Sequence, residues 1–368
     1  MDMKSLLKQL VEAESPSTDK AAVDRIGMII ADEARRLGAE VQTVPIKEAG
    51  DQIIARFAPS KAEEENTSGI LLLCHRDTVF PLGTLEKMPF READDKIFGP
   101  GVLDMKAGIV ISLAAIEKLQ NTGGLIHPVT LLCTSDEETG SSTSESIIKE
   151  LAQFSELVLV MEPALPDGSL KTWRKGVGEF LIKVKGRAAH AGGAHEEGRN
   201  AIEEMAHQVL TIQSLTNYGW QTTLNVGVLH GGTVSNVVPE EAVAEVDVRV
   251  MKPGEWERVE AEMHALKPVL DGTSLEITGG LNRPPMPFDD MMKTTFEKAK
   301  SIAEGIGIEL KAGGSGGGSD GNFVAPLGIP VLDGLGAIGS GLHSEREFIF
   351  VDSLQERANL LAALIQHW

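Results

Sequence analysis

Apolar residues recur along this chain with two periods, one typical of amphipathic helices and one typical of buried strands. Residues 3–11 carry apolar side chains three and four positions apart, which predicts a helix, and a second helix is predicted over residues 21–37 up to Gly38. Short β-like runs follow, several of them almost wholly apolar, as expected of strands covered on both faces. These predicted strands span residues 52–57, 69–74, 129–134, 157–161 and 330–332.

Further helical patterns lie between and after these strands, at residues 107–119, 144–151, 291–305 and 351–365. Alternation of apolar strands with helices predicts an α/β fold in which helices cover a mainly parallel sheet. At roughly 150 residues per domain, a chain of 368 residues is expected to form two domains.

The pattern changes near Lys175, where the strands become half-exposed and a different order of elements begins. Strand, helix, strand, strand, helix and strand follow one another, which predicts a ferredoxin-like (βαββαβ) domain. These elements span residues 178–185, 198–215, 223–229, 242–250, 253–270 and 273–278. We therefore expect a discontinuous larger domain at residues 1–174 and 287–368, interrupted by a smaller domain at 175–286.

Composition and charge exclude several classes of protein and partner. The chain is 42% hydrophobic and 24% charged, as in an ordinary globular protein rather than a disordered one. Its 34 Lys and Arg against 54 Asp and Glu give a net charge of −20, which argues against nucleic acid and anionic membranes as partners. No apolar run reaches about 18 residues, and the first residues do not resemble a signal peptide. The two cysteines, Cys74 and Cys133, cannot make a disulfide framework and are expected to be buried thiols, so we expect a cytoplasmic protein.

Histidine and carboxylate side chains cluster directly after the predicted buried strands. They are His75 and Asp77, Glu137 and Glu138, and Glu162, with Asp104 just before a predicted helix. The carboxyl ends of parallel strands meet at one edge of an open sheet, and ligands bind there. Several carboxylates at one edge would repel one another unless cations lay among them. This pattern favours two divalent ions bridged by one carboxylate.

Each of these positions also has an ordinary explanation when it is taken alone. A single carboxylate after a strand, such as Asp136, is usually a helix N-cap or a loop residue. A single histidine after a strand is more often a hydrogen-bonded structural residue than a ligand. Metal binding is the better interpretation because several separate strand ends and loops carry such groups together.

The ordered motifs of the chain resemble those of the M20 metallopeptidase family, in its glutamate carboxypeptidase branch. The motifs are His75-x-Asp77-Thr78-Val79, Gly101-x-x-Asp104-Met105-Lys106-Ala107-Gly108, Glu137-Glu138 and His343-Ser344. The resemblance covers essentially the whole chain. It implies that the larger domain is a zinc-hydrolase domain and that the inserted one is a dimerisation or lid domain. It also implies a cis peptide bond after Asp104.

The resemblance implies a site for two zinc ions, with cobalt or manganese as alternative metals. His75 and Glu162 would bind one ion, Glu138 and His343 would bind the other, and Asp104 would bridge both. Each ion would then have three protein ligands and one open position, as a catalytic site needs.

The resemblance also assigns roles to residues that do not bind metal. Asp77 would accept a hydrogen bond from the His75 ring. Glu137 would act as general base, taking a proton from a water between the ions and delivering it to the leaving nitrogen. His190 would reach the site of a partner subunit and stabilise the oxyanion, so a homodimer is implied. His195 is the alternative for this role, and for that residue an ordinary surface loop is the simpler explanation.

Three further residues match positions that contact the substrate in this branch. Asn236 and Arg249 would bind its carboxylate, and a planar guanidinium suits bidentate carboxylate recognition. For Arg249, an ion pair with Asp247 on the same strand is the alternative. Gly318 belongs to a loop whose backbone amides would lie beside the same carboxylate. The Gly- and Ser-rich segment 313–319 also spells a nucleophile-elbow pattern, but the strand-to-helix context that this motif requires is missing.

Together these features predict a metallo-carboxypeptidase that releases a C-terminal amino acid from a small peptide or an N-acyl amino acid. The closest alternative is a deacylase of the same fold, of the aminoacylase, acetylornithine deacetylase or succinyl-diaminopimelate desuccinylase type. A non-catalytic protein that binds metal or ligand is the alternative from another class. The presence of all five ligands together with Glu137 weighs against it.

Overall fold

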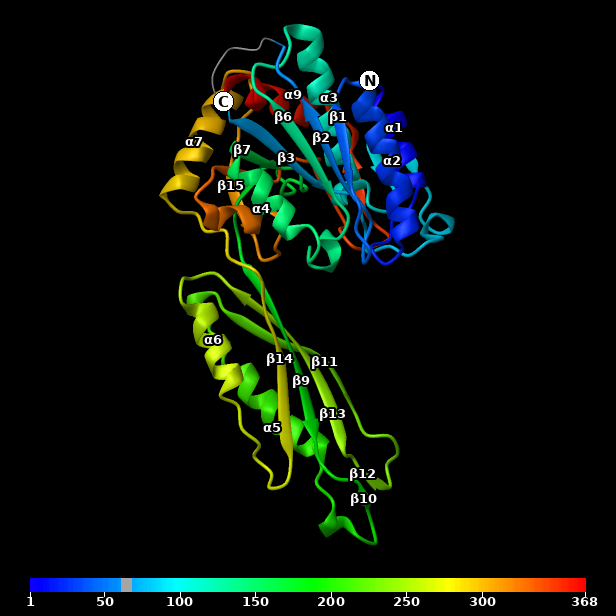
Figure 1. Ribbon diagram of the computed structural model, residues 1–368, viewed down its shortest axis with the longest axis vertical. Helices are drawn as coiled ribbons and strands as arrows, with labels where there is room; N and C mark the ends of the chain where they lie inside the picture. Colours follow the sequence, from blue (N-terminus) through cyan, green and yellow to red (C-terminus); the bar gives the residue numbers. More distant parts are fainter. Residues whose placement is uncertain (61–67) are drawn as a thin grey trace. The chain divides into compact units, whose positions relative to one another are not determined.

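The computed structural model describes residues 1–60 and 68–368, which divide into two compact units (Figure 1). The first unit consists of Met1–Trp173, Phe288–Ser315 and Ser319–Trp368. The second unit consists of Arg174–Pro287 together with the three glycines Gly316–Gly318. The second unit is therefore almost continuous in sequence, whereas the first is assembled from segments on both sides of it.

An eight-stranded sheet forms the centre of the first unit, in the order β1-β2-β6-β3-β7-β16-β8-β15. Its four central strands are parallel: β6 (Val129–Thr134), β3 (Gly69–His75), β7 (Ser155–Val160) and β16 (Val331–Asp333). They are almost wholly buried, as their apolar sequences predict. Outside them lie β2 (Gln52–Phe57) and the edge strand β1 (Glu40–Val44) on one side, and β8 (Leu170–Arg174) and the edge strand β15 (Ala312–Ser315) on the other. The prediction of an α/β fold is confirmed, with antiparallel pairs added beside the parallel centre.

Seven α-helices belong to this unit within the described residues: α1 (Met3–Glu12), α2 (Lys20–Arg36), α3 (Ala107–Thr122), α4 (Glu145–Gln153), α7 (Asp290–Glu304), α8 (Gly321–Val324) and α9 (Val351–His367). The helix α3 is buried along nearly its whole length and packs against α1 and α9. One hydrophobic cluster joins the sheet to α1, α2, α3, α7 and α9. This core holds the carboxyl ends of the central strands in fixed positions.

A second, smaller sheet lies in the same unit and was not predicted from the sequence. Its order is β17-β18-β5-β4, with β4 (Arg91–Ala93), β5 (Lys96–Phe98), β17 (Gly339–Ser340) and β18 (Phe348–Phe350). Strands of two or three residues are too short to show a period. The pairing of β5 with β18 brings the chain just before Asp104 next to the chain just after His343.

The second unit is built on a four-stranded antiparallel sheet with the order β11-β13-β9-β14. Its elements are β9 (Gly176–Lys185), α5 (Ala201–Ser214), β11 (Thr223–Gly231), β13 (Glu241–Val250), α6 (Glu255–His264) and β14 (Ser274–Arg283). A short ladder of β10 (Ala189–His190) and β12 (Val237–Val238) extends from it. The predicted ferredoxin-like order is confirmed. The helix α6 ends before the predicted residue 270, because Pro268 and the residue before it disfavour helical backbone.

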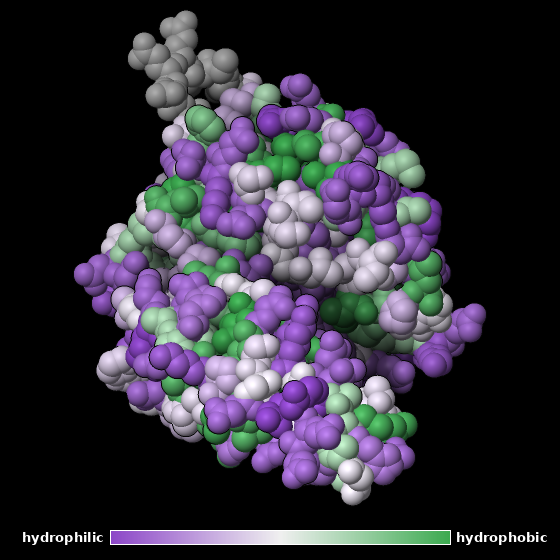
Figure 2. Space-filling model, turned by 60° about the horizontal axis from the view of Figure 1, so that its bottom comes forward, coloured by the Kyte–Doolittle hydropathy of each residue, from purple (hydrophilic) through white to green (hydrophobic). Residues whose placement is uncertain are grey.

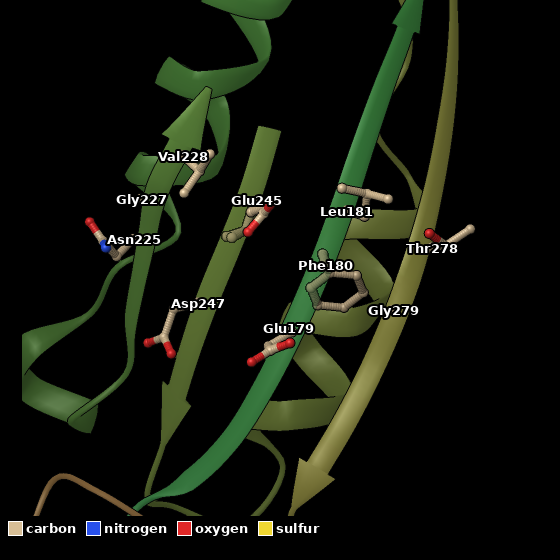
Figure 3. Close-up of a pocket in the computed structure, with 11 residues that line it drawn as sticks. Glu179, Phe180, Leu181, Asn225, Gly227, Val228, Glu245, Asp247, Thr278 and Gly279 are labelled. Atoms are coloured by element: carbon tan, nitrogen blue, oxygen red, sulfur yellow. The ribbon is translucent and has the colours of Figure 1, made fainter. Parts of the chain in front are cut away.

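The two faces of this second sheet differ in polarity. Helices α5 and α6 pack on one face and bury a hydrophobic cluster that includes Phe180 and Trp256. On the opposite face, Glu179, Glu245 and Asp247 lie beside a hollow of about 390 Å³ (Figure 3). Within the described residues of both units, no helix has the length and apolar character needed to cross a membrane.

Candidate metal centre

The carboxyl ends of the central parallel strands bring the predicted site residues together. His75 is the last residue of β3, and Glu162 follows β7 by two residues. Glu137 and Glu138 lie in a short 3₁₀ turn, Glu137–Thr139, which begins three residues after the last residue of β6. Because β6, β3 and β7 are parallel neighbours, these side chains reach the same edge of the sheet.

Asp104 lies between two histidines. The Nε2 atom of His75 is 3.2 Å from Asp104 Oδ1, and the Nε2 atom of His343 is 3.2 Å from Asp104 Oδ2. The two oxygens of one carboxylate therefore face different imidazole rings, which is the arrangement that a bridging ligand requires. The peptide bond between Asp104 and Met105 is cis, which confirms the expectation drawn from the motif.

Each histidine also faces a second carboxylate. Glu162 Oε1 is 3.4 Å from His75 Nε2, and Glu138 Oε2 is 3.3 Å from His343 Nε2. The five predicted ligands thus form two groups that share Asp104. Glu137 lies close to one of these groups, because a carboxylate oxygen of Glu137 is within 4.8 Å of ligand atoms of both His75 and Glu162.

The donor set of this site fits divalent metal ions. Imidazole nitrogens and carboxylate oxygens are ligands that zinc accepts, and manganese and cobalt accept them as well. Glu138 Oε1 is buried and has no hydrogen-bond partner within the described residues, which is costly for a carboxylate unless a cation contacts it. The ring of His75 is also correctly oriented, because its Nδ1 lies 3.1 Å from the backbone carbonyl of Asp77. Donation from Nδ1 to that carbonyl leaves the Nε2 lone pair free for a metal.

Asp77 makes more hydrogen bonds than the single one, from the His75 ring, that the family resemblance implies. Its side chain is fully buried and accepts a hydrogen bond from Ser17 Oγ at 2.8 Å. It also accepts hydrogen bonds from the backbone N–H groups of Glu137 at 3.3 Å and Glu138 at 3.2 Å. Its Oδ1 lies 3.4 Å from His75 Nδ1, which is farther than the backbone carbonyl of Asp77 itself. Asp77 therefore connects the His75 ring with the turn that carries both glutamates.

We expect Asp77→Asn to lower activity by about 10–100-fold, a typical effect for a residue that supports metal ligands. An asparagine amide group cannot accept hydrogen bonds with both of its polar atoms, so at least one of the two backbone donors loses its acceptor. Zinc content and turnover measured side by side test this expectation. Unchanged turnover would show that the Glu137–Glu138 turn does not depend on Asp77.

The carboxylates raise the affinity of both histidines for protons in the metal-free protein. Asp104 and Glu138 raise the pKa of His343 to about 10. Burial acts to lower the pKa of His75, but hydrogen bonds to Asp104, Asp77 and Glu162 raise it well above its usual value. Burial likewise acts to raise the pKa of Asp104, yet its contacts with His343 and His75 hold that pKa well below the usual range.

These shifts predict how metal binding depends on pH. His343, with a pKa of about 10, carries a proton on both ring nitrogens at neutral pH when no metal is bound, and a metal ion must displace one of them. We expect the apparent zinc affinity of the site that contains His343 to rise about tenfold per pH unit between about pH 6 and pH 8. Chelator competition at several pH values, with calorimetric counting of released protons, measures this slope. An affinity independent of pH would contradict the expectation that His343 is a ligand.

The second unit carries His190 and Asn236 close together at one end of its sheet. The backbone N–H of Ala191 donates to the carbonyl of Asn236 at 2.9 Å. Nδ1 of the exposed His190 accepts hydrogen bonds from the backbone N–H groups of Gly192 at 3.1 Å and Gly193 at 3.0 Å. The ring hydrogen of a neutral His190 must then be on Nε2, which makes that nitrogen a donor.

Arg249 lies at the other end of the same sheet, where it pairs with Asp247. Arg249 Nε is 2.9 Å and 3.1 Å from the two carboxylate oxygens of Asp247, and its Nη2 is 2.7 Å from one of them. This ion pair is the alternative that the sequence left open. Gly318 is held at this end too, because Arg174 Nη1 donates to its carbonyl at 3.0 Å. Arg174 is buried, and sequence reasoning did not single it out.

Comparison with known proteins identifies the family. Residues 71–367 match the model of peptidase family M20/M25/M40. The chain is 29% identical to carboxypeptidase G2 of Pseudomonas sp. (strain RS-16), over 98% of this chain and 87% of that protein. It is 27% identical to a succinyl-diaminopimelate desuccinylase of Delftia acidovorans, over 81% of each chain.

Solved structures share the fold across both units. The aminopeptidase PepT from Bacillus cereus has a TM-score of 0.81 at 24% identity and covers 99% of this chain and 97% of its own. An M20 family metallo-carboxypeptidase from Sulfolobus solfataricus has a TM-score of 0.78 at 17% identity, with 100% and 99% coverage. The chain therefore belongs to peptidase family M20/M25/M40.

Proposed function

We propose that this protein is a two-zinc amidohydrolase that releases a free amino acid from a small peptide or an N-acyl amino acid, with carboxypeptidase activity as the first candidate. The observation that carries this proposal is the position of Asp104, whose two oxygens face His75 and His343 separately. The similarity of the chain to proteins named carboxypeptidase G2 and succinyl-diaminopimelate desuccinylase supports amide hydrolysis in general. It leaves the acyl group open, so deacylation of an N-acyl amino acid is the second candidate.

In this proposal His75, Glu162, Glu138 and His343 would hold the two ions, and Asp104 would be shared by both. When bound, such ions supply an acidified water and polarise the scissile carbonyl group. Glu137 accepts the proton of the attacking water on its carboxylate. It then delivers that proton to the amide nitrogen as the carbon–nitrogen bond breaks, which releases a neutral amine. Asp77 keeps the Glu137 turn in place through its two backbone hydrogen bonds.

Recognition of a substrate carboxylate is supported by a cationic cluster in the second unit. Arg174, Lys175, Arg249 and Arg283 lie near one end of its sheet, although the whole chain has a net charge of −20. Burial and the nearby charge of Arg249 lower the pKa of Lys175, so another cation is already close to its ammonium group. Such an arrangement favours an anionic ligand. Arg249 would bind a substrate carboxylate either while it keeps its ion pair with Asp247 or after that ion pair breaks.

We further propose that the active form is a homodimer in which His190 acts on the partner's substrate. Arg249 pairs with Val177 in the sheet, whereas His190 lies beyond Lys185. Val177 and Lys185 are eight residues apart on β9, which corresponds to about 26 Å at about 3.3 Å per residue. His190 and Arg249 of one chain therefore cannot both contact one small substrate. Two chains related by a two-fold axis can supply one residue each.

Exposed hydrophobic side chains support the dimer. Edge strand β11 exposes Val228 and Leu229, helix α5 exposes Leu210, and Tyr218 and Trp220 are exposed between them. Figure 2 shows on one face of the molecule that hydrophobic residues form small patches within a largely hydrophilic surface. An edge strand with exposed apolar neighbours can pair with a second copy of the same chain.

We also propose a cytoplasmic location. Cys74 and Cys133 are both buried free thiols. Burial raises the pKa of each thiol, which makes both of them unreactive. Two such cysteines suit a reducing compartment.

The experiment that tests the proposed activity is a substrate panel with zinc-loaded protein. We expect turnover of dipeptides or N-acyl amino acids that have a free α-carboxylate, and much slower turnover of the same compounds as C-terminal amides. Dipeptides cleaved faster than N-acyl amino acids would favour the carboxypeptidase, and the reverse would favour the deacylase. Two tightly bound ions without hydrolysis of any amide would support the non-catalytic alternative instead.

A further inference from the structure

The side chain of Glu347 is completely buried beside the loop that carries Asp104. Its Oε2 accepts a hydrogen bond from the backbone N–H of Gly101 at 2.9 Å. Its Oε1 accepts two more, from Leu103 at 2.7 Å and from Asp104 itself at 2.9 Å. One carboxylate therefore binds three backbone donors of a single short loop.

Glu347 also belongs to the segment that carries His343. The backbone N–H of Glu347 donates to the carbonyl of Ser344 at 3.1 Å, and the N–H of Ser344 donates to Gly341 at 3.1 Å. The first turn, Gly341 to Ser344, contains His343, and the second leads from Ser344 to Glu347. Glu347 consequently joins two segments 243 residues apart in sequence, one of which supplies Asp104 and the other His343. The two side chains meet with His343 Nε2 at 3.2 Å from Asp104 Oδ2.

A buried carboxylate is an expensive way to hold a loop, because its charge must be removed from water. Burial raises the pKa of Glu347 to about 7, and the electrostatic interaction with the buried ammonium group of Lys106 favours the charged form of both groups. The ammonium nitrogen has no hydrogen-bond partner within the described residues. A loop fixed by three N–H donors is also fixed in orientation, which one apolar contact would not achieve. This arrangement therefore points to a requirement for position rather than for stability alone.

We propose that Glu347 is a positioning residue that fixes the two oxygens of Asp104 against His75 and His343, and so sets the geometry for binding two metal ions. The inference rests on the proposed function in taking Asp104 as the bridging ligand. Glu347 would contact neither metal nor substrate, because its carboxylate acts through the backbone of the Asp104 loop. Loss of Glu347 should weaken the binding of both ions. The effect should be larger for the ion bound by His343 and Glu138, because Glu347 also shapes the His343 segment.

The test uses Glu347→Gln in the full chain, titrated with Zn²⁺ alone after removal of metal. Glutamine keeps the size of the side chain, but its amide nitrogen cannot accept a hydrogen bond. At least one of the three backbone N–H groups therefore loses its acceptor. We expect zinc affinity to fall by about 10–100-fold, the typical effect of losing a residue that orients metal ligands. At saturating zinc, kcat should fall while KM for the substrate stays nearly unchanged. Thermal unfolding of the metal-free variant should remain within a few degrees of the unmodified protein.

Glu345→Gln is the matched control, because it removes the same charge from an exposed side chain two residues away. We expect its zinc affinity to be unchanged. If Glu347→Gln does not fold, Glu347→Asp keeps the charge on a shorter side chain, and an intermediate zinc affinity is expected. Zinc affinity equal to that of the unmodified protein in either folded Glu347 variant would overturn the inference. Failure of the unmodified protein to bind two ions would instead refute the proposed function.

Discussion

Glu137→Gln should lower turnover by at least about 10²-fold while the protein keeps two zinc ions per chain. Glutamine has nearly the same shape as glutamate but cannot take a proton from water. In the proposed site the five metal ligands are other residues, so removal of the Glu137 charge leaves both ions their full ligand sets. The backbone hydrogen bond from Glu137 to Asp77 does not involve the side chain and should persist.

The neighbouring residue provides the matched control for this prediction. Glu138 Oε2 lies 3.3 Å from His343 Nε2, and its other oxygen is buried without a hydrogen-bond partner within the described residues. Glu138→Gln should therefore lose zinc as well as turnover. Metal analysis after dialysis separates the two variants. Loss of zinc from Glu137→Gln would make Glu137 a ligand beside His75 and Glu162, and normal turnover would remove it from the mechanism.

The sequence predicts the fold well wherever an element is long enough to repeat a pattern. Strands β2 and β6 have the ends that their apolar runs predict, and the six elements of the second unit occur in the expected order. Strands β5 and β18 contain three residues each, and neither carries a periodic signal. They form only because distant parts of the chain meet. Local patterns cannot report such pairings.

Some residues of the site can be recognised from the sequence, whereas others can be recognised only from their contacts in the folded chain. His75 and Asp77 are recognisable because a histidine and a carboxylate stand together directly after an apolar strand. Glu347 follows no strand and belongs to no motif quoted above, and its role depends on a loop 243 residues away. Arg249 had two interpretations that its spacing from Asp247 could not separate. The structure contains the ion pair with Asp247, and contact of Arg249 with a substrate carboxylate stays a prediction.

Mixing two inactive variants, His190→Ala and Glu137→Gln, should restore about a quarter of normal activity once subunits exchange freely. Half of the dimers are then expected to be mixed. Each mixed dimer has one site with an intact Glu137 in its own chain and an intact His190 from the partner. The other site carries both defects. Alone, His190→Ala should cost about 10²–10³ in kcat, because it removes a donor to the charge that develops on the tetrahedral intermediate.

The expectation depends on where His190 lies in its own unit. Its Nε2 is the donor nitrogen, since Nδ1 accepts from the N–H groups of Gly192 and Gly193. His190 is also separated from Arg249 by most of the length of β9, so in the proposed dimer the donor and the carboxylate anchor would come from different chains. His195→Ala is the matched control, and alone it should keep near-normal turnover. If His190 acted within its own chain, every site in the mixture would keep one defect. Mixed dimers demonstrated by mass spectrometry but without recovered activity would therefore refute action across the interface.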